Sequence, residues 1–233
     1  MISRRMFCGC ALAACGLSAS AANAQIACEY LTPQGQAGVS PTQAIQRLKD
    51  GNDRMLAGKS INCDANGMFR KAGAGQAPIA AIISCIDSRA APEIVFDQHL
   101  GDIFVARVAG NIANVDIIGS LEYATKVAGA KAIVVLGHSK CGAIKSAVDG
   151  VKMGNITALL KQFEPALATL KPADGKRDSH NDVMVQKVAL ANAMLTAQNL
   201  TKRSAIIKKL VEDKQLSIVA AMEDVSTGKV TWL

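Results

Sequence analysis

The 233-residue chain has few aromatic residues: one tryptophan, two tyrosines and five phenylalanines. Proteins that stack nucleic-acid bases need aromatic side chains on a basic surface. The lysines and arginines that give this chain a formal charge of +7 are scattered rather than clustered. We therefore expect no nucleic-acid binding, and at most a preference for small anionic ligands.

Two common functional motifs are also missing. The chain has no Gly-x-x-x-x-Gly-Lys-Ser/Thr sequence, so it lacks the usual phosphate-binding loop for nucleotide hydrolysis. After residue 24 it has no Cys-x-x-Cys pair, which leaves a thioredoxin-like redox site unsupported.

Repeats and low-complexity segments are absent too. The length suits one domain over residues 25–233, with residues 25–56 as an N-terminal arm.

The first 24 residues are typical of an export signal. Two arginines precede a short apolar stretch, and residues 22–24 (ANA) form a small-x-small cleavage site. Residues 3–7 (SRRMF) also resemble a twin-arginine signal. We therefore expect a signal peptide over residues 1–24 and export to a bacterial periplasm, which leaves a charge of +5 on residues 25–233.

Two alternatives stay open at this terminus. The segment could remain attached as an anchor, although its apolar part is too short to cross a bilayer as a helix, so we expect no membrane span. Residues 12–15 (LAAC) resemble a lipobox, which would make Cys15 a lipid-anchored N-terminus instead.

Four of the seven cysteines lie beyond the signal: Cys28, Cys63, Cys85 and Cys141. In an oxidising compartment, exposed free thiols are disfavoured, so a disulfide, a metal or burial should account for each. We expect Cys28 and Cys63 to pair, with burial of both as small apolar residues the alternative.

The remaining sequence alternates apolar, strand-like runs with helix-like segments. The predicted strands are 79–85, 103–108, 132–136, 216–222 and a short one ending at residue 233 after a turn at 226–229. The predicted helices are 41–55, 91–96, 117–128 and most of 143–212 with a break at 172–179, whereas 25–39 and 57–78 are predicted as irregular and loop. This alternation predicts an α/β fold: a mostly parallel central sheet flanked by helices, an antiparallel C-terminal edge strand and an N-terminal helical arm.

Polar side chains follow two of the predicted strands. Cys85-x-Asp87-x-Arg89 ends the first, and Gly137-His138-x-x-Cys141 follows the third. Because the carboxyl ends of parallel strands meet at one edge of a sheet, these groups can converge there. Two cysteines and a histidine suit Zn²⁺, and Asp87 can take the fourth tetrahedral position. Two alternative interpretations stay open at this point: that Cys85 is an inert buried thiol, and that Cys85 and His138 form a nucleophilic pair.

In these motifs the sequence resembles the β-class carbonic anhydrases, over roughly residues 41–233. The matching segments, in order, are CIDSR (85–89) with Pro92-Glu93, GDIFVARVAGN (101–111), GSLEY (119–123), GHSKCGA (137–143) and TGKV (227–230). The resemblance implies a zinc lyase that reversibly hydrates carbon dioxide to bicarbonate and a proton, by attack of a zinc-bound hydroxide.

The resemblance also implies the role of each site residue. Cys85, His138 and Cys141 would hold one Zn²⁺ per subunit. Asp87 would either bind the metal and close the site or pair with Arg89 and leave the fourth position to water. Two residues apart on an extended segment, Asp87 and Arg89 can form a bidentate pair that keeps the carboxylate ionised and off the metal.

Within the family, the sequence is similar to the plant-like subtype with an open zinc. Gln76, Phe104, Tyr123 and Gly142 fall where that subtype binds substrate, the tyrosine coming from a dimer partner. Ile82 replaces the tryptophan typical of the bicarbonate-regulated subtype. The alternative is that Phe104 is a core residue and Gln76 a solvated loop residue.

The resemblance further implies a homodimer or a higher even oligomer, with the helix at 41–55 wrapping a partner. His99 is unusual for the family and is either a proton shuttle or a surface residue, and His180 is expected at the surface. Two alternative functions stay open: hydrolysis of carbon disulfide or carbonyl sulfide on the same fold, and a non-catalytic zinc-binding relative.

Overall fold

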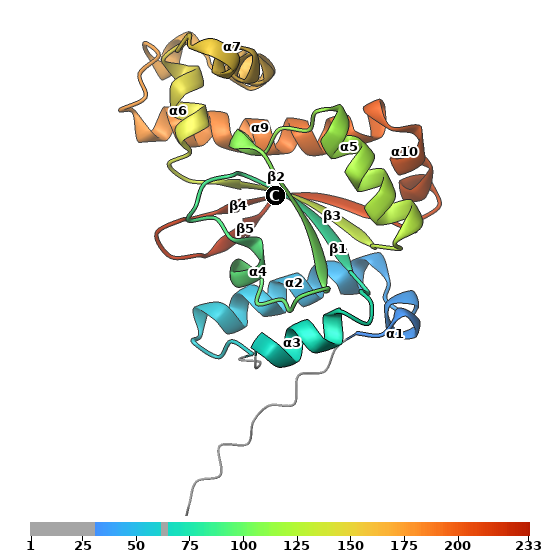
Figure 1. The fold of residues 1–233 in the computed structure, drawn as a ribbon. Helices are drawn as coiled ribbons and strands as arrows, with labels where there is room; N and C mark the ends of the chain where they lie inside the picture. Colours follow the sequence, from blue (N-terminus) through green and yellow to red (C-terminus); the bar gives the residue numbers. More distant parts are fainter. Residues whose placement is uncertain (1–30, 62–64) are drawn as a thin grey trace, which may run out of the picture.

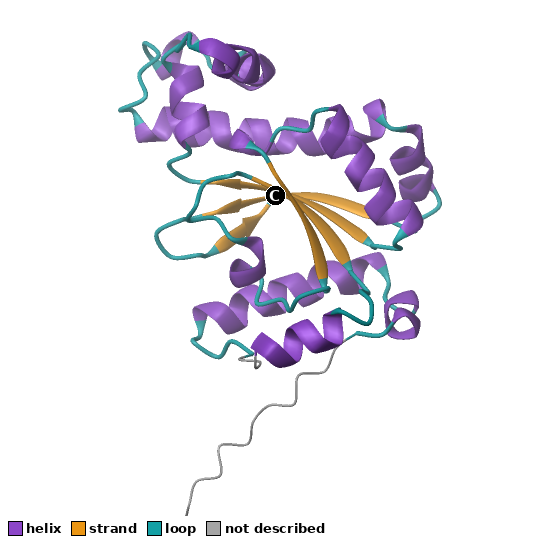
Figure 2. Ribbon diagram, in the orientation of Figure 1, coloured by secondary structure: helices purple, strands orange, loops and turns teal. Residues whose placement is uncertain are grey.

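Residues 31–61 and 65–233, which the computed structural model describes, build a five-stranded sheet between two helical layers (Figures 1 and 2). The strands are β1 (Ala80–Ser84), β2 (Ile103–Arg107), β3 (Ala132–His138), β4 (Ser217–Glu223) and β5 (Val230–Trp232). Their order is β2-β1-β3-β4-β5; only the β4–β5 pair is antiparallel. The predicted fold class and all five predicted strands are confirmed.

The order of the strands creates a switch point between β1 and β3. From β1 the chain moves to β2 on one side and then crosses to β3 on the other. In open parallel sheets, ligands bind beyond the carboxyl ends of the strands at such a point, because the connections there leave in opposite directions. Every residue of β1 and β3 is buried, which fixes the two strand ends firmly in the core.

One face of the sheet is covered by helices near the N-terminus, drawn below the sheet in Figure 1. These are α1 (Pro33–Ala37), α2 (Pro41–Leu56), α3 (Ala65–Ala72) and α4 (Pro92–Val95). Ser40 caps α2 with a reciprocal capping box, and Ala44 and Leu48 are fully buried against the sheet. The apolar side of α2 therefore covers its own sheet, and the expected contact of this helix with a partner stays a prediction.

The opposite face carries the other helices (Figure 1). They are α5 (Val115–Glu122), α6 (Gly142–Val148), α7 (Gly154–Leu160), α8 (Glu164–Leu167), α9 (Asp182–Arg203) and α10 (Ala205–Glu212). Short 3₁₀ turns lie at η1 (Ala109–Asn111), η3 (Lys161–Phe163) and η4 (Pro172–Asp174), and a π-helical turn, η2 (Tyr123–Val127), extends α5. The long α9 packs directly on β3 and β4.

The predicted secondary structure was wrong or incomplete in three places. Helix α3 occupies part of the predicted loop at 57–78, because residues with good helix propensity such as Met68, Arg70 and Lys71 form two turns among the glycines. Helix α1 occupies part of the irregular lead-in, where Thr32 caps it. The helical stretch after Cys141 also breaks at 149–153 and at Ser204, in addition to the predicted break at 172–179.

Two regions with predicted features fall outside the described residues. Residues 1–30 include the expected signal peptide, Cys15 and Cys28, and residues 62–64 include Cys63. The expected Cys28–Cys63 disulfide therefore stays a prediction. Among the helices that the structure does describe, none is both long enough and apolar enough to cross a membrane.

Substitution of Gly51 by alanine should destabilise the fold. Gly51 lies in α2 where the helix meets α4, and an added methyl group would overlap the backbone carbonyl of Phe96. Overpacking against rigid backbone should cost about 1–3 kcal/mol of unfolding free energy, measured by chemical denaturation. Asp53→Ala, at an exposed position of the same helix, is the matched control and should change stability little. Equal stability of the two variants would contradict the close α2–α4 packing.

Candidate metal centre

Three potential metal ligands converge at the switch point of the sheet. Cys85 directly follows β1, His138 is the last residue of β3, and Cys141 comes immediately before α6. Lys140 adopts a positive φ of 55°, which turns the chain sharply between His138 and Cys141. The predicted convergence of the two motifs is thus confirmed by the fold.

The ligand atoms of Cys85, His138 and Cys141 all lie within 4.8 Å of one another, and all three residues are buried. His138 Nδ1 lies 2.9 Å from the Ser139 carbonyl oxygen. Since a carbonyl only accepts, Nδ1 carries the proton and the Nε2 lone pair is free to bind a metal. Nε2 is buried without a hydrogen-bond partner, which is costly unless something else fills that role.

The two thiols have opposite acid strengths. A hydrogen bond from the Cys141 thiol lowers the pKa of Cys85 to about 4 in spite of burial, and the Gly110 N–H acts in the same direction. The Cys85 thiolate beside it, and burial, in turn raise the pKa of Cys141. Without a cation the pair therefore keeps one proton, and a divalent metal is what would hold both sulfurs as thiolates. The donor set of two thiolates and one imidazole fits zinc.

Asp87 and Arg89 form the bidentate pair that the sequence predicts. Arg89 Nε donates to Asp87 Oδ1 at 2.9 Å, and Arg89 Nη2 donates to Asp87 Oδ2 at 2.8 Å. The Arg89 backbone N–H donates to the same carboxylate at 3.1 Å. These bonds hold the pKa of Asp87 well below its usual range. Asp87 Oδ2 lies 4.0 Å from His138 Nε2. The carboxylate therefore lies beside this potential ligand while Arg89 binds both of its oxygens.

Arg107 stabilises the backbone of this loop, a role that the sequence analysis did not assign. From the end of β2, its Nε donates to the Cys85 carbonyl at 2.8 Å and its Nη2 to the Asp87 carbonyl at 2.6 Å. Both bonds fix the segment that carries Cys85 and Asp87. Its place at the end of a predicted strand beside the site was the available signal.

Glu223 is a second residue that the sequence analysis missed. It faces His138 in the parallel β3–β4 register and is 2% exposed. Burial raises its pKa to about 7, and its carboxyl group lies beside the three potential metal ligands. The end of the predicted strand 216–222 marked its position, but only the register shows what it faces.

The four predicted substrate-binding residues do not all lie at this site. Gly142 begins α6 beside Cys141, with open space around it. Phe104 pairs with Ala81 near the start of β1, about 13 Å of strand away from Cys85. Gln76 is exposed and precedes β1, at the end opposite the metal ligands. Tyr123 is 53% exposed and makes an edge contact with the Phe104 ring, at a centroid distance of 6.3 Å.

Phe104 and Tyr123 line a hollow of about 760 Å³ between β2 and α5. Phe104 is only partly buried, so the prediction of a simple core residue does not describe it fully. In one chain, neither these rings nor Gln76 reach the three ligands.

The two other histidines lie away from the ligand cluster. His99 precedes β2, at the opposite end of the sheet, with Nδ1 3.3 Å from Asp102 Oδ2. It is 9% exposed, so the prediction of a surface residue was wrong, and its position does not support a shuttle within the same chain. His180 is exposed beside Asp178, as predicted.

The known proteins that this chain resembles in sequence are carbonic anhydrases. A family model described as carbonic anhydrase matches residues 80–230. A carbonic anhydrase of Mycolicibacterium smegmatis is 44% identical, over 82% of this chain and 92% of that protein. Carbonic anhydrase 2 of Mycobacterium tuberculosis is 34% identical, over 82% and 91%.

Solved structures give the same result. A tetrameric β-carbonic anhydrase of Sordaria macrospora superimposes with a TM-score of 0.65 at 26% identity, over 71% of this chain and 85% of that one. The β-carbonic anhydrase CcaA gives a TM-score of 0.64 at 26% identity, over 81% and 86%. The fold, the cysteine–histidine–cysteine cluster and these matches together establish that the chain belongs to the carbonic anhydrase family, in its β class.

Proposed function

We propose that the protein catalyses the zinc-dependent, reversible hydration of carbon dioxide to bicarbonate and a proton. The observation that carries this proposal is the convergence of Cys85, His138 and Cys141 beside a carboxylate that an arginine holds aside. Zinc in such a site lowers the pKa of a bound water to about 7, which supplies a hydroxide nucleophile at neutral pH.

The protein's own groups hold Asp87 aside from Cys85, His138 and Cys141, the residues that would bind zinc. Arg89 binds both oxygens of Asp87, and Arg107 fixes the backbone on which Asp87 sits. With zinc held by those three residues, the ionised Asp87 could accept a hydrogen bond from the nucleophilic water and so direct an oxygen lone pair toward carbon dioxide. A purely structural zinc site would not need this arrangement, which favours catalysis over a non-catalytic role.

We propose further that the site is completed by a second copy of the chain. Gln76, Phe104 and Tyr123 lie toward the end of the sheet opposite the ligands. Strand β2 is at the sheet edge with partly exposed side chains, next to exposed apolar residues of α5 and η2. Antiparallel pairing of two such edges about a twofold axis would bring these three residues of one chain toward the ligands of the other.

For the cellular location we propose export to the periplasm by the twin-arginine route. The support is the double arginine, the short apolar stretch and the small-x-small sequence within residues 1–24. Lipid attachment at Cys15 is the alternative, which mass spectrometry of the mature N-terminus would distinguish.

The central test compares zinc content and carbon dioxide hydration in the purified protein and in Cys141→Ser. The wild-type protein should hold one zinc per subunit and hydrate carbon dioxide in a stopped-flow assay. Cys141→Ser should lose most of both, because it removes one of three protein ligands. Ser84→Ala, a buried neighbour of Cys85, is the control and should keep both. A zinc-loaded wild-type protein that hydrolyses carbonyl sulfide or carbon disulfide but does not hydrate carbon dioxide would overturn the proposal.

Arg89→Ala should leave the zinc in place and reduce hydration by about 10- to 100-fold. Without the guanidinium, the ionised Asp87 is free to take the fourth ligand position and exclude water. Arg177→Ala, which removes an exposed arginine outside the site, should hydrate carbon dioxide as the wild type does. Full activity of Arg89→Ala with full zinc content would reject the gating role.

Mixing two inactive variants tests whether the site is shared between chains. Gln76→Ala removes a group that would serve the partner's site, whereas Arg89→Ala disables the chain's own site. Random mixed dimers should recover about one quarter of wild-type hydration, because half are mixed and one of their two sites is intact. Co-refolding each variant with itself is the control. No recovery from verified mixed dimers would place Gln76 in its own chain's site, and full activity of Gln76→Ala alone would place it outside any site.

A further inference from the structure

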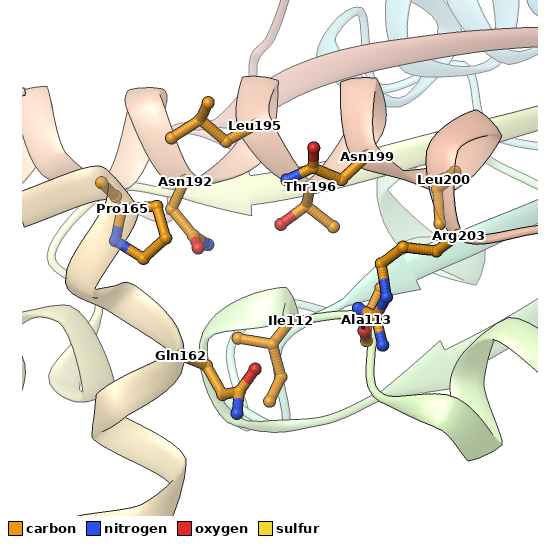
Figure 3. A pocket seen from close by; sticks show the side chains of 11 residues that line it. Ile112, Ala113, Gln162, Pro165, Asn192, Leu195, Thr196, Asn199, Leu200 and Arg203 are labelled. Atoms are coloured by element: carbon orange, nitrogen blue, oxygen red, sulfur yellow. Dashed lines mark hydrogen bonds between the residues drawn. The ribbon is translucent and has the colours of Figure 1, made fainter.

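Asn192 occupies a buried position in α9 that the account so far does not use. It is 4% exposed and lies on the wall of a small hollow, about 130 Å³, between α9, α8 and the loop after β2. Figure 3 shows its side chain leaving α9 between Pro165 and Thr196, toward the loop that carries Ile112. Its Nδ2 donates a hydrogen bond to the Gly110 carbonyl at 2.9 Å.

Gly110 connects this asparagine to a metal ligand. Its backbone N–H donates to Cys85 Sγ at 3.2 Å. Gly110 has a φ of 70°, in the left-handed region that favours glycine, and an added Cβ would overlap the fully buried ring of Phe163. Phe163 on one side and Asn192 on the carbonyl therefore fix the orientation of Gly110 in the η1 turn.

We propose that Asn192 is a positioning residue for the metal centre: by holding the Gly110 carbonyl, it aims the Gly110 N–H at the Cys85 sulfur. An N–H bond to a thiolate draws electron density from the sulfur, which stabilises the anionic ligand and leaves the bound metal more electrophilic. This matters here because two thiolates donate more charge to zinc than imidazoles do. Asn192 would offset part of that donation without touching metal or substrate.

The inference rests on the proposed zinc centre, and its test uses the purified full chain. Asn192→Leu keeps a similar volume but removes the donor. We expect zinc affinity, measured by competition with a chromogenic chelator, to fall about 10-fold. In the cobalt-substituted protein, the thiolate-to-cobalt charge-transfer band should move to longer wavelength, because a sulfur without its hydrogen bond is oxidised more easily.

Asn199→Leu is the matched control. Asn199 lies two turns further along α9 and lines the same hollow. Its substitution should leave zinc affinity and the cobalt band as in the wild type, which separates the bond to Gly110 from a general change in this hollow.

A merely structural role for Asn192 predicts a different pattern. In that case Asn192→Leu would lower the unfolding midpoint but leave zinc affinity and the cobalt band unchanged, which would overturn the inference. If Asn192→Leu does not fold, Asn192→Ala decides: it also removes the donor, without adding apolar bulk, and should show the same losses. A wild-type protein that binds no zinc would instead contradict the proposed function.

Discussion

The bidentate bond between Arg89 and Asp87 is the interaction on which the proposed chemistry depends. Three buried ligands alone would make a metal site, but an ionised carboxylate stands beside them, 4.0 Å from His138 Nε2. Arg89 engages both carboxylate oxygens and lowers the pKa of Asp87, so the group stays charged and occupied. An ion pair as exposed as this one contributes little to stability, which makes its value at the site one of position rather than energy.

The fold supplies this pair with rigid support. Buried strands β1 and β3 end side by side at the switch point, and each carries a ligand there. Arg107 ties the Cys85–Asp87 backbone to β2, and Asn192 ties the Gly110 turn to α9. Side chains from β2 and α9, which are far apart in the sequence, thus hold the backbone segments around the Cys85 sulfur. A few tenths of an ångström at such a loop matter, because a metal site tolerates little variation in ligand geometry.

The sequence predicts the strands and the ligands well because both depend on local patterns. Apolar runs mark the buried strands, and the spacing of Cys85, His138 and Cys141 is specific in combination. The sequence-based prediction fails for α3, because the glycines in this region favoured a loop over the helix that its good helix formers make. It also fails for Glu223, Arg107 and Asn192, whose roles depend on register and on packing between distant elements. Gln76 and Phe104 show a further limit: their positions make sense for catalysis only if a second chain contributes.

The most direct test of this account is a crystal structure of the zinc-loaded protein near neutral pH. The account predicts zinc on Cys85, His138 and Cys141, with Asp87 still bonded to Arg89 through both oxygens and solvent in the fourth position. An active protein in which Asp87 binds the zinc and Arg89 has turned away would contradict it.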